Sequence, residues 1–272
     1  MIGRMSAPVS RASKRQSEII TLLRKSGRVA VEDLAAEFSV ALQTIRRDLN
    51  ELSEEGRVVR VHGGAIVASG VENLAYDARQ LVAHDQKRLI GEAAARLIPD
   101  NSSLFINIGT TTEEVAKALS RHSGLLVITN NLHVASELHR SSAVEIFLTG
   151  GTVRQSDGGI VGAVTVEQIE QFRVDFAVIG TSAIDQTGTL LDFDIREVEI
   201  SRAIVEHARK IILVSDSSKF SRSAPVRIAH LSEIDVFVTD RIPSPAIDQL
   251  CQRCEVKVIE VGGPAESDGE DT

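Results

Sequence analysis

Two groups of residues in this sequence have types and spacings that could do chemistry. The first is Gln43-Thr44-Ile45-Arg46-Arg47, which places an amide, a hydroxyl and two guanidinium groups close together. From a helix in the major groove of DNA, such groups reach base edges and phosphates. The second is a series of glycines, hydroxyls and amides that each follow an apolar run, beginning with Gly109-Thr110-Thr111-Thr112. Glycine and hydroxyls at the start of a helix suit a small anion.

Two short helical patterns must position the first group. They cover Glu32–Phe38 and Leu42–Leu52 and flank a tight connection at residues 39–41. Apolar residues at helical spacing can close a small core between them. These residues are Leu34, Ala35, Phe38, Ile45 and Leu49. The pattern predicts a helix-turn-helix whose second helix reads DNA through Gln43, Thr44, Arg46 and Arg47. The alternative is a protein-interaction module, in which Arg47 and Glu51 form an i,i+4 pair on a solvated face.

A short strand pair is predicted directly after the second helix. Gly56 ends that helix, and the residues from Arg57 to Ala65 alternate between valines and polar groups. We expect the valines to pack inward and Arg57, Arg60 and His62 to face a DNA backbone or minor groove. A winged helix-turn-helix domain over residues 14–65 follows, with its first helix at about 14–24 and a disordered tail before it.

The charge distribution agrees with a DNA-binding head on a different body. The chain has 272 residues and a net charge of −8, but residues 1–65 hold 11 Lys+Arg against 8 Asp+Glu. The remainder is strongly acidic. No apolar run has the roughly 18 residues of a membrane span, and the N-terminus resembles no secretory signal, so a cytoplasmic location is expected. The two cysteines exclude a disulfide framework, and Cys251-x-x-Cys254 is expected to be structural rather than a metal site.

Beyond a linker at 66–86, the pattern changes to short apolar strands that alternate with helices. Over residues 87–261 this predicts an α/β domain with a mostly parallel sheet covered on both faces. The tail at 262–272 is acidic and is expected to be disordered. Seven strands are expected near residues 104–108, 125–129, 144–148, 176–180, 211–215, 236–239 and 256–261.

The carboxyl ends of these strands carry the second chemical group. Open α/β sheets bind ligands beyond the carboxyl ends of their strands. We therefore expect a phosphorylated sugar or polyol to bind at Gly109, Thr110, Thr111, Thr112, Asn130, Asn131, Gly150, Gly151, Arg154, Gly180 and Lys219, where Arg154 and Lys219 would supply positive charge. No G-x-G-x-x-G follows the first strand, so a dinucleotide cofactor is not expected. No cofactor, catalytic residue or metal ligand is assigned.

Simpler interpretations exist for several of these residues. Thr111 and Glu114 have the spacing of a capping box that needs no ligand, and Gly150-Gly151 could be only a turn. Four carboxylates gather around a glycine-containing turn at residues 186–189. Asp185, Asp192, Asp194 and Glu197 could be general bases of a sugar-phosphate isomerase, or they could orient hydroxyls or lie in solvent.

The motifs together resemble the bacterial DeoR-type transcriptional repressors. The resemblance rests on Phe38–Leu49, on His62-Gly63-Gly64-Ala65 and on the strand ends. The latter are Ile108–Thr111, Thr129–Asn131, Gly150-Gly151 and Asp216–Phe220. It covers about residues 14 to 260. The resemblance implies a homo-oligomeric repressor, dimeric or tetrameric, that leaves operator DNA when a phosphorylated effector binds. It also implies a sensor domain similar in fold to ribose-5-phosphate isomerase.

Further stretches favour glycerol-3-phosphate as the effector within that family. They are Asp157–Gly162, Gln171–Phe176 and Gly188–Val198. Two residues depart from the usual pattern, because Asn107 stands where aspartate is frequent and Ala183 where glycine is frequent. The alternative is a DeoR-type regulator of another sugar-phosphate pathway.

Overall fold

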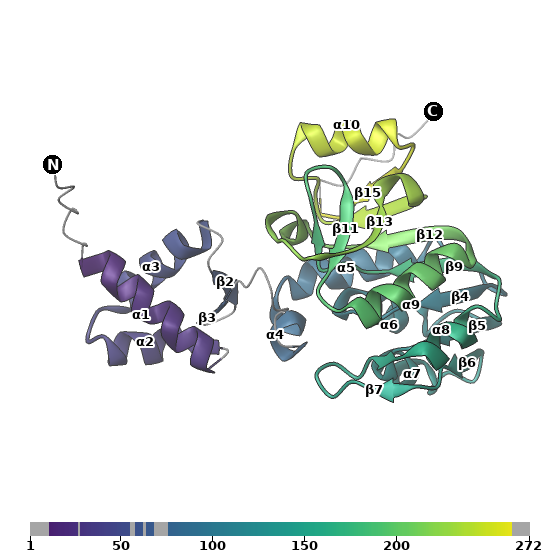
Figure 1. Cartoon of the computed structure of the whole chain (residues 1–272), viewed down its shortest axis with the longest axis horizontal. Coiled ribbons are helices and arrows are strands. Elements are labelled where there is room, and N and C mark those ends of the chain that lie inside the picture. Colours follow the sequence, from purple (N-terminus) through teal and green to yellow (C-terminus); the bar gives the residue numbers. More distant parts are fainter. Residues whose placement is uncertain (1–10, 27, 55–57, 62–63, 68–75, 263–272) are drawn as a thin grey trace, which may run out of the picture. The chain divides into compact units, whose positions relative to one another are not determined.

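A computed structural model describes residues 11–26, 28–54, 58–61, 64–67 and 76–262 of the chain. The chain divides into two compact units, each described by itself. One consists of Met1–Ser69 with Asp77–Val82, and the other of Gly70–Tyr76 with Ala83–Thr272. Figure 1 shows the helices and strands of both units.

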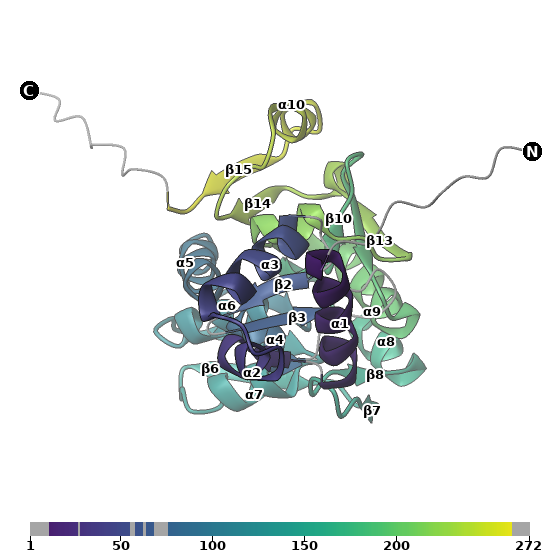
Figure 2. The same ribbon diagram turned by 90° about the vertical axis from the view of Figure 1, so that its left-hand side faces the viewer.

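The N-terminal unit is a winged helix-turn-helix, as the sequence predicts. Its strands form an antiparallel sheet in the order β1-β3-β2. Figure 2 has its three helices towards the viewer, with β2 and β3 behind them. The elements are α1 (Arg11–Ser26), β1 (Arg28–Ala30), α2 (Val31–Glu37), α3 (Leu42–Glu54), β2 (Val58–Val61) and β3 (Gly64–Val67). Because α1 begins at Arg11, the prediction of a disordered tail up to residue 13 is wrong for its last three residues; residues 1–10 lie outside the described ranges.

A small apolar core holds the three helices together. Ile19 and Leu23 of α1, Leu34 of α2, and Ile45 and Leu49 of α3 are all fully buried. Each set lies at helical spacing, so each helix presents one apolar stripe to the others. Between α2 and α3 the chain turns sharply, and Ser39 takes a left-handed backbone conformation with φ of 51°.

The expected linker at 66–86 contains regular structure in its second half. Helix α4 (Tyr76–Leu81) lies there, and α5 (His84–Ala95) begins three residues earlier than expected. Strand β3 also extends to Val67. The predicted linker at 66–86 is therefore longer than the stretch without helix or strand. A six-residue helix is too short to show an apolar period in the sequence, and residues 68–75 lie outside the described part.

The C-terminal unit is built on a seven-stranded parallel sheet (Figure 1). Its strands are β4 (Ser103–Ile106), β5 (Leu125–Thr129), β6 (Val144–Leu148), β9 (Val174–Ile179), β12 (Ala208–Val214), β14 (Val236–Thr239) and β15 (Lys257–Glu260). Their order is β15-β14-β12-β9-β4-β5-β6. The chain runs outward from β4 to β6, then returns to the other side of β4 at β9. This reversal between β4 and β9 is the place where open α/β sheets bind ligands.

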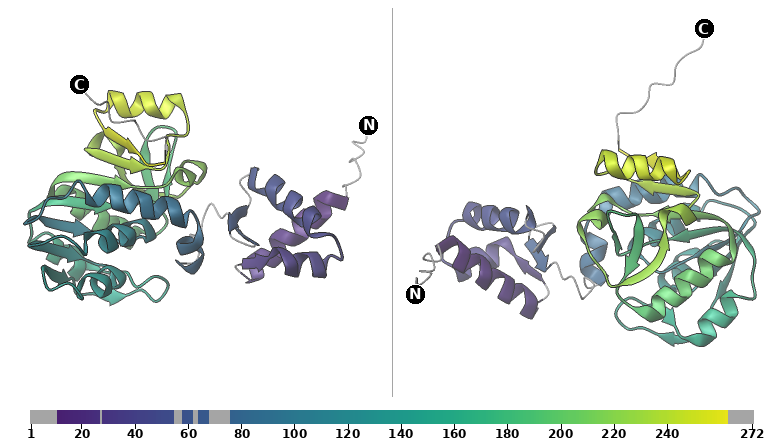
Figure 3. Two further views of the ribbon diagram at one scale, coloured as in Figure 1. Left: turned by 180° about the vertical axis from the view of Figure 1, so that it is seen from behind. Right: turned by 45° about the horizontal axis from the view of Figure 1, so that its top comes forward.

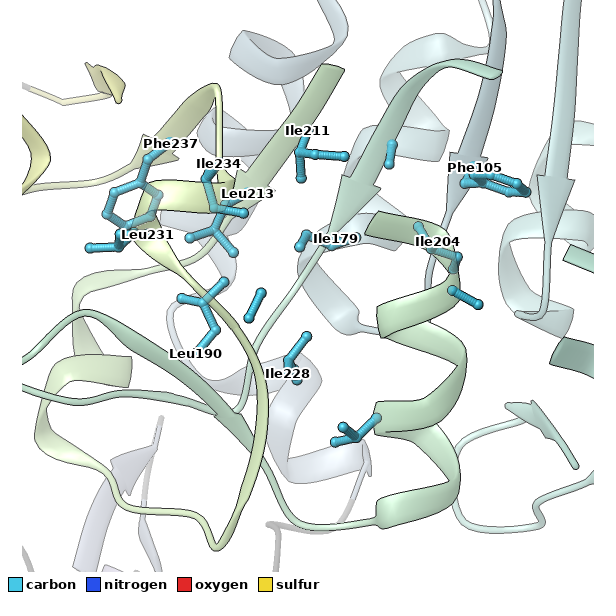
Figure 4. Close-up of a cluster of buried hydrophobic side chains, with 14 of the residues drawn as sticks. Phe105, Ile179, Leu190, Ile204, Ile211, Leu213, Ile228, Leu231, Ile234 and Phe237 are labelled. Carbon is cyan, nitrogen blue, oxygen red and sulfur yellow. The ribbon is translucent and has the colours of Figure 1, made fainter. Parts of the chain in front are cut away.

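Alternation along the strands gives the sheet two apolar faces. Leu104 and Ile106 of β4 belong to one buried cluster, and Phe105 between them belongs to the other. The first face packs against α5, α6 (Thr110–Leu119) and α7 (Leu132–Leu138). The second packs against α8 (Ala163–Ile169), α9 (Ile195–Glu206) and α10 (Pro245–Arg253). Figure 3 shows α5 across the sheet in its left-hand view, and Figure 4 shows the second cluster.

Besides β1, three short strands and one hairpin are not predicted by the sequence pattern. Strands β10 (Ala183–Ile184), β11 (Thr189–Asp192) and β13 (Val226–His230) form a separate antiparallel sheet. Strands β7 (Thr152–Val153) and β8 (Ile160–Val161) pair as a hairpin. Elements of two to five residues carry too little periodicity to be recognised. None of the helices in the described ranges has both the length and the apolar character to cross a bilayer.

Candidate functional site

Helix α3 exposes one polar face. Gln43, Arg46 and Arg47 are exposed and Thr44 is half-buried, whereas Ile45 is buried against the core. Asn50 lies on the same exposed face, one turn beyond Arg46 and Arg47, and was not picked from the sequence. The spacing of Asn50 from Arg47 (i,i+3) and from Arg46 (i,i+4) indicates that it shares their face of the helix. The structure thus brings the four predicted residues to one end of one helix.

A half-buried ion pair joins α3 to α1. The Arg15 guanidinium donates through Nε and Nη2 to Asp48 at 2.5 and 3.0 Å, and Asp48 is buried. This hydrogen bond raises the pKa of Arg15. Nearby, Gln16 Nε2 donates to Glu51 at 2.7 Å, and Arg47 pairs with the same carboxylate at 3.0 Å. The recognition surface therefore depends on polar contacts between two helices as well as on the apolar core.

Replacing Asp48 by alanine is expected to lower the free energy of unfolding of the N-terminal unit by about 2 kcal/mol, because Arg15 loses a buried partner. Urea denaturation of the full-length protein, followed by circular dichroism, measures the change. Asp33→Asn, exposed on α2, is the control and should shift stability by less than about 0.5 kcal/mol. Equal stability of the two variants would show that the pair does not hold α3.

The predicted wing is present as backbone. Strands β2 and β3 pair antiparallel, with Arg60 opposite Ala65. Val58 and Ala65 are buried, as expected for the inward side of the wing. Arg57 and His62 lie outside the described residues, and the orientation of the Arg60 side chain is not described.

The chain segments on both sides of the sheet reversal meet closely. Gly109 is the N-cap of α6, with φ of 151°, and no side-chain cap closes this helix N-terminus in the described structure. A Cβ added at Gly180, after β9, would lie 3.7 Å from Thr112 Cγ2 and 3.9 Å from the carbonyl oxygen of Ile108. The two predicted glycine sites are therefore neighbours. The capping box predicted as an alternative for Thr111 and Glu114 does not form, since Gly109 is the cap and Glu114 pairs with Lys117 at 2.7 Å.

Buried polar atoms without partners also gather at the carboxyl ends of the strands. Among the described residues, Asn130 Oδ1, Thr149 Oγ1 and Asp216 Oδ2 are buried and make no hydrogen bond. They follow β5, β6 and β12. Burying such an atom unpaired costs about 1 to 3 kcal/mol, so each needs an explanation. A ligand with hydroxyls would supply one.

Positive charge lies at the end of β12. Lys219 and Lys87 are both buried, and both act electrostatically on Asp216, as does Arg222. Burial by itself raises the pKa of Asp216, but Lys219, a hydrogen bond from Ser218, Lys87 and Arg222 together lower it. Lys219, Lys87 and Arg222 thus place three cationic groups around the Asp216 carboxylate, and cationic groups of this kind bind phosphate.

Lys87 is a residue that the sequence reasoning missed. It lies in α5 on the side of Ile90 and Ala94, which face the core. A lysine on the apolar face of a helix was the available signal, because lysine is almost never fully buried unless it is paired.

Gly150 and Gly151 hold a loop against α8. The Gly150 N–H donates to Gln168 Oε1 at 2.6 Å, and its carbonyl accepts from Thr165 Oγ1 at 2.8 Å. Gly151 has φ of 143°, and a Cβ there would lie 2.4 Å from Thr165 Oγ1. These contacts favour the turn interpretation of the glycine pair.

Arg154 is already surrounded by carboxylates. It pairs with Asp157 at 2.7 Å, with Asp194 at 2.9 Å and with Glu197 at 2.6 Å. Burial by itself lowers the pKa of Arg154, but Asp157 and Glu197 raise it well above its usual range. With three carboxylates on one guanidinium, little positive charge is left for an effector. Arg154 instead ties the β7–β8 hairpin to the N-terminus of α9.

The other carboxylates considered as general bases have structural partners. Asp185 accepts from the backbone N–H groups of Thr187 and Thr189 within its own turn. Asp192 Oδ1 accepts from the N–H of Phe193 at 2.7 Å.

Of the two cysteines, Cys251 is buried, and burial raises the pKa of its thiol to about 11. It therefore stays protonated near neutral pH.

The carboxylate of Asp194, which pairs with Arg154 and Arg196, predicts that the stability of the protein depends on pH in the acid range. A hydrogen bond from Arg196 is the main cause that lowers the pKa of Asp194 from 3.8 to about 2. The stabilisation from this group is present above about pH 4 and is lost as the pH falls towards its folded pKa. The Tm difference between wild type and Asp194→Asn should therefore narrow from neutral pH to about pH 3. A difference that stays constant with pH would contradict this assignment; differential scanning calorimetry measures it.

Comparison with known proteins identifies the family. Residues 15–71 match the model of the DeoR-like helix-turn-helix domain, and residues 82–241 match that of the DeoR C-terminal sensor domain. The chain belongs to the DeoR family. It is 44% identical over 238 residues to the glycerol-3-phosphate regulon repressor of Escherichia coli K12, covering 88% of this chain and 94% of the relative.

A second DeoR-family relative is less similar but is again named a repressor. The transcriptional repressor CsqR of E. coli K12 is 37% identical, over 94% of this chain and 98% of its own. With such relatives and a DeoR-like helix-turn-helix, this DeoR protein is a transcriptional regulator and not an enzyme.

Ribose 5-phosphate isomerase A from Neisseria gonorrhoeae is a structural neighbour of the chain. The match has a TM-score of 0.35 and 14% identity, over 49% of this DeoR chain and 52% of the isomerase. At this score the likeness does not bear on function. The predicted fold class, an α/β sensor domain behind a winged helix-turn-helix, is confirmed by the two domain models together with the seven-stranded sheet.

Proposed function

We propose that the protein represses a catabolic operon and leaves its operator when a phosphorylated polyol binds, with glycerol-3-phosphate as the effector. The observations that carry the effector class are the two buried lysines around Asp216, Lys87 and Lys219, and the N-terminus of α6, which no side chain caps. The identity with glycerol-3-phosphate regulon repressors supports the particular effector.

The phosphate end of the effector is placed at Gly109 and the first turn of α6. Backbone N–H groups and the helix dipole stabilise an anion there, and the two lysines add charge-assisted hydrogen bonds. Gly180 leaves room beside Thr112, because its added Cβ would make only ordinary contacts at 3.7 Å or more. The hydroxyl end would donate to Asn130 Oδ1 and Thr149 Oγ1, which otherwise stay unpaired among the described residues.

Operator DNA is placed on α3 and on the wing. Gln43 is the candidate base reader, since its amide can make two hydrogen bonds to adenine. Thr44, Arg46 and Arg47 would contact bases or phosphates from the same face. The wing would hold the backbone through Arg57, Arg60 and His62.

The repressor is proposed to act in the cytoplasm as a homo-oligomer. Helix-turn-helix proteins bind paired half-sites because dimer symmetry matches that of the operator. Sedimentation equilibrium distinguishes a dimer from a tetramer.

Isothermal titration calorimetry tests the effector. Glycerol-3-phosphate, fructose-1,6-bisphosphate and ribose-5-phosphate are titrated separately into the purified full-length protein. Selective heat from glycerol-3-phosphate, followed by loss of operator binding at the same concentrations, supports the proposal. Selective binding of another phosphate would assign the protein to a different pathway, and no heat from any of them would reject the anion site.

A further inference from the structure

Tyr76 lies at a junction between the two units of the chain. It is the first residue of α4 and the last of the segment Gly70–Tyr76, which belongs to the C-terminal unit. The next residues, Asp77–Val82, belong to the N-terminal unit. Tyr76 therefore lies where the chain passes from one unit to the other, so that a change in the contacts of its side chain acts at this boundary.

Two contacts hold this side chain in the C-terminal unit. The phenol Oη donates to Glu113 Oε2 at 2.7 Å. The ring stacks on His133, with centroids 4.8 Å apart and ring planes inclined by 10°. Glu113 is buried, so water competes little with this hydrogen bond.

Asn131 joins the two contacts into a closed ring. Its Nδ2 donates to Glu113 Oε1 at 3.2 Å, and its Oδ1 accepts from the backbone N–H of His133 at 2.8 Å. Tyr76, Glu113, Asn131 and His133 thus form a circuit whose members come from α4, α6, the end of β5 and α7. We call these four residues the Tyr76 circuit.

The circuit shares two of its members with the proposed effector site. Glu113 is in the first turn of α6, where the phosphate is placed, and Asn131 follows Asn130 at the end of β5. A phosphate dianion beside a buried carboxylate is a like-charge contact, which costs free energy. An effector hydroxyl would also compete with Glu113 for the amide of Asn131. Binding of the effector and integrity of the circuit therefore oppose each other.

We propose that the Tyr76 circuit couples the effector site to DNA binding: it is closed in the operator-binding form and opens when the effector binds, which releases Tyr76 and the start of α4 from the C-terminal unit. This inference rests on the proposed function. A ligand shifts only an equilibrium whose two states it binds unequally, and the circuit supplies the difference, because its closed form places Glu113 against the anion. Closed is the arrangement that the structure shows.

The first test needs no effector. Tyr76→Phe keeps the ring but removes the hydrogen bond, and Glu113→Gln removes the charge. Each variant should weaken binding to an operator duplex about tenfold, the effect of one charge-assisted hydrogen bond. The duplex is selected by the wild-type protein from a random pool. The double variant should bind no more weakly than either single variant, because both break the same circuit. Glu114→Gln, the next residue of α6, is the control and should bind like wild type.

The second test uses the natural fluorescence of the protein. The chain contains one tyrosine and no tryptophan, so tyrosine emission reports Tyr76 alone. Titration with glycerol-3-phosphate should change this emission with the same midpoint as the heat of binding.

In Tyr76→Phe and Glu113→Gln, the ratio of operator affinities without and with effector should fall about tenfold.

The outcomes separate the circuit from the proposed function. The proposed function would be rejected if the wild-type protein selects no duplex from the pool. It would also be rejected if the wild-type protein stays bound to the selected duplex in saturating glycerol-3-phosphate. The first test then decides the circuit whenever DNA binds. Wild-type operator affinity in both single variants, additive effects in the double variant, or unchanged emission while the effector binds would overturn the circuit.

Discussion

The Lys219→Ala protein is expected to bind its operator normally and to bind glycerol-3-phosphate about 30-fold more weakly. Lys219 is buried and, like Lys87, acts electrostatically on Asp216, and removing one charge-assisted contact to a phosphate costs about 2 kcal/mol. Release of the operator should need proportionally more effector. Calorimetry gives the affinity, and a gel-shift titration against increasing glycerol-3-phosphate gives the release curve.

Two further variants make that experiment decisive. Lys210→Ala removes an exposed lysine near the amino end of β12, the strand that precedes Lys219 in the chain, and should leave both affinities unchanged. Thr111→Val keeps the shape of the side chain and removes a buried hydroxyl at the first turn of α6, so effector affinity should fall about fivefold. Because Lys219 also offsets Asp216, thermal unfolding must show that Lys219→Ala is folded. Normal induction in Lys219→Ala and Thr111→Val would place the effector elsewhere.

The Arg47→Ala protein is expected to bind operator DNA about tenfold to a hundredfold more weakly while its affinity for the effector stays the same. The Arg47 side chain is 82% exposed on the polar face of α3. Loss of a base or phosphate contact from such a position costs about 1 to 3 kcal/mol. Gel-shift titrations at several salt concentrations measure both the affinity and its salt dependence.

Glu51→Gln is the matched control for Arg47. Arg47 pairs with Glu51 at 3.0 Å, so the loss of this pair in Arg47→Ala also changes the stability of the helix. An exposed i,i+4 pair contributes only about 0.5 kcal/mol. Glu51→Gln should therefore keep or increase operator affinity. If Arg47 contacts a phosphate, Arg47→Ala should also lower the salt slope by about one. Operator affinity equal to wild type in Arg47→Ala would reject the assignment of α3 as the recognition helix.

The local pattern of the sequence was sufficient for the secondary structure that surrounds both sites. The strands at 125–129, 144–148 and 236–239 have the predicted bounds, because each is a short, mainly apolar run between polar segments. Leu34, Ile45 and Leu49 are buried as their helical spacing indicated. The polar residues on α3 share a face for the same reason, since a helix has a fixed period.

Only the tertiary structure decided which carboxylates each cation meets. Arg154 and Lys219 look alike as cations after strands, yet Arg154 meets Asp157, Asp194 and Glu197. Those last two partners are about 40 residues away in the sequence, and local spacing carries no information on such contacts. Lys87 became a candidate only when its helix packed with that side chain inward.

The contact between Tyr76, Glu113 and His133 is of the same non-local kind, and it depends on a helix too short to be recognised from its sequence. The sequence by itself therefore determined the family, the two domains and the chemical types at the strand ends, because these follow from short-range patterns. The tertiary structure decided how those groups pair, because the strand order brings distant segments to one edge of the sheet.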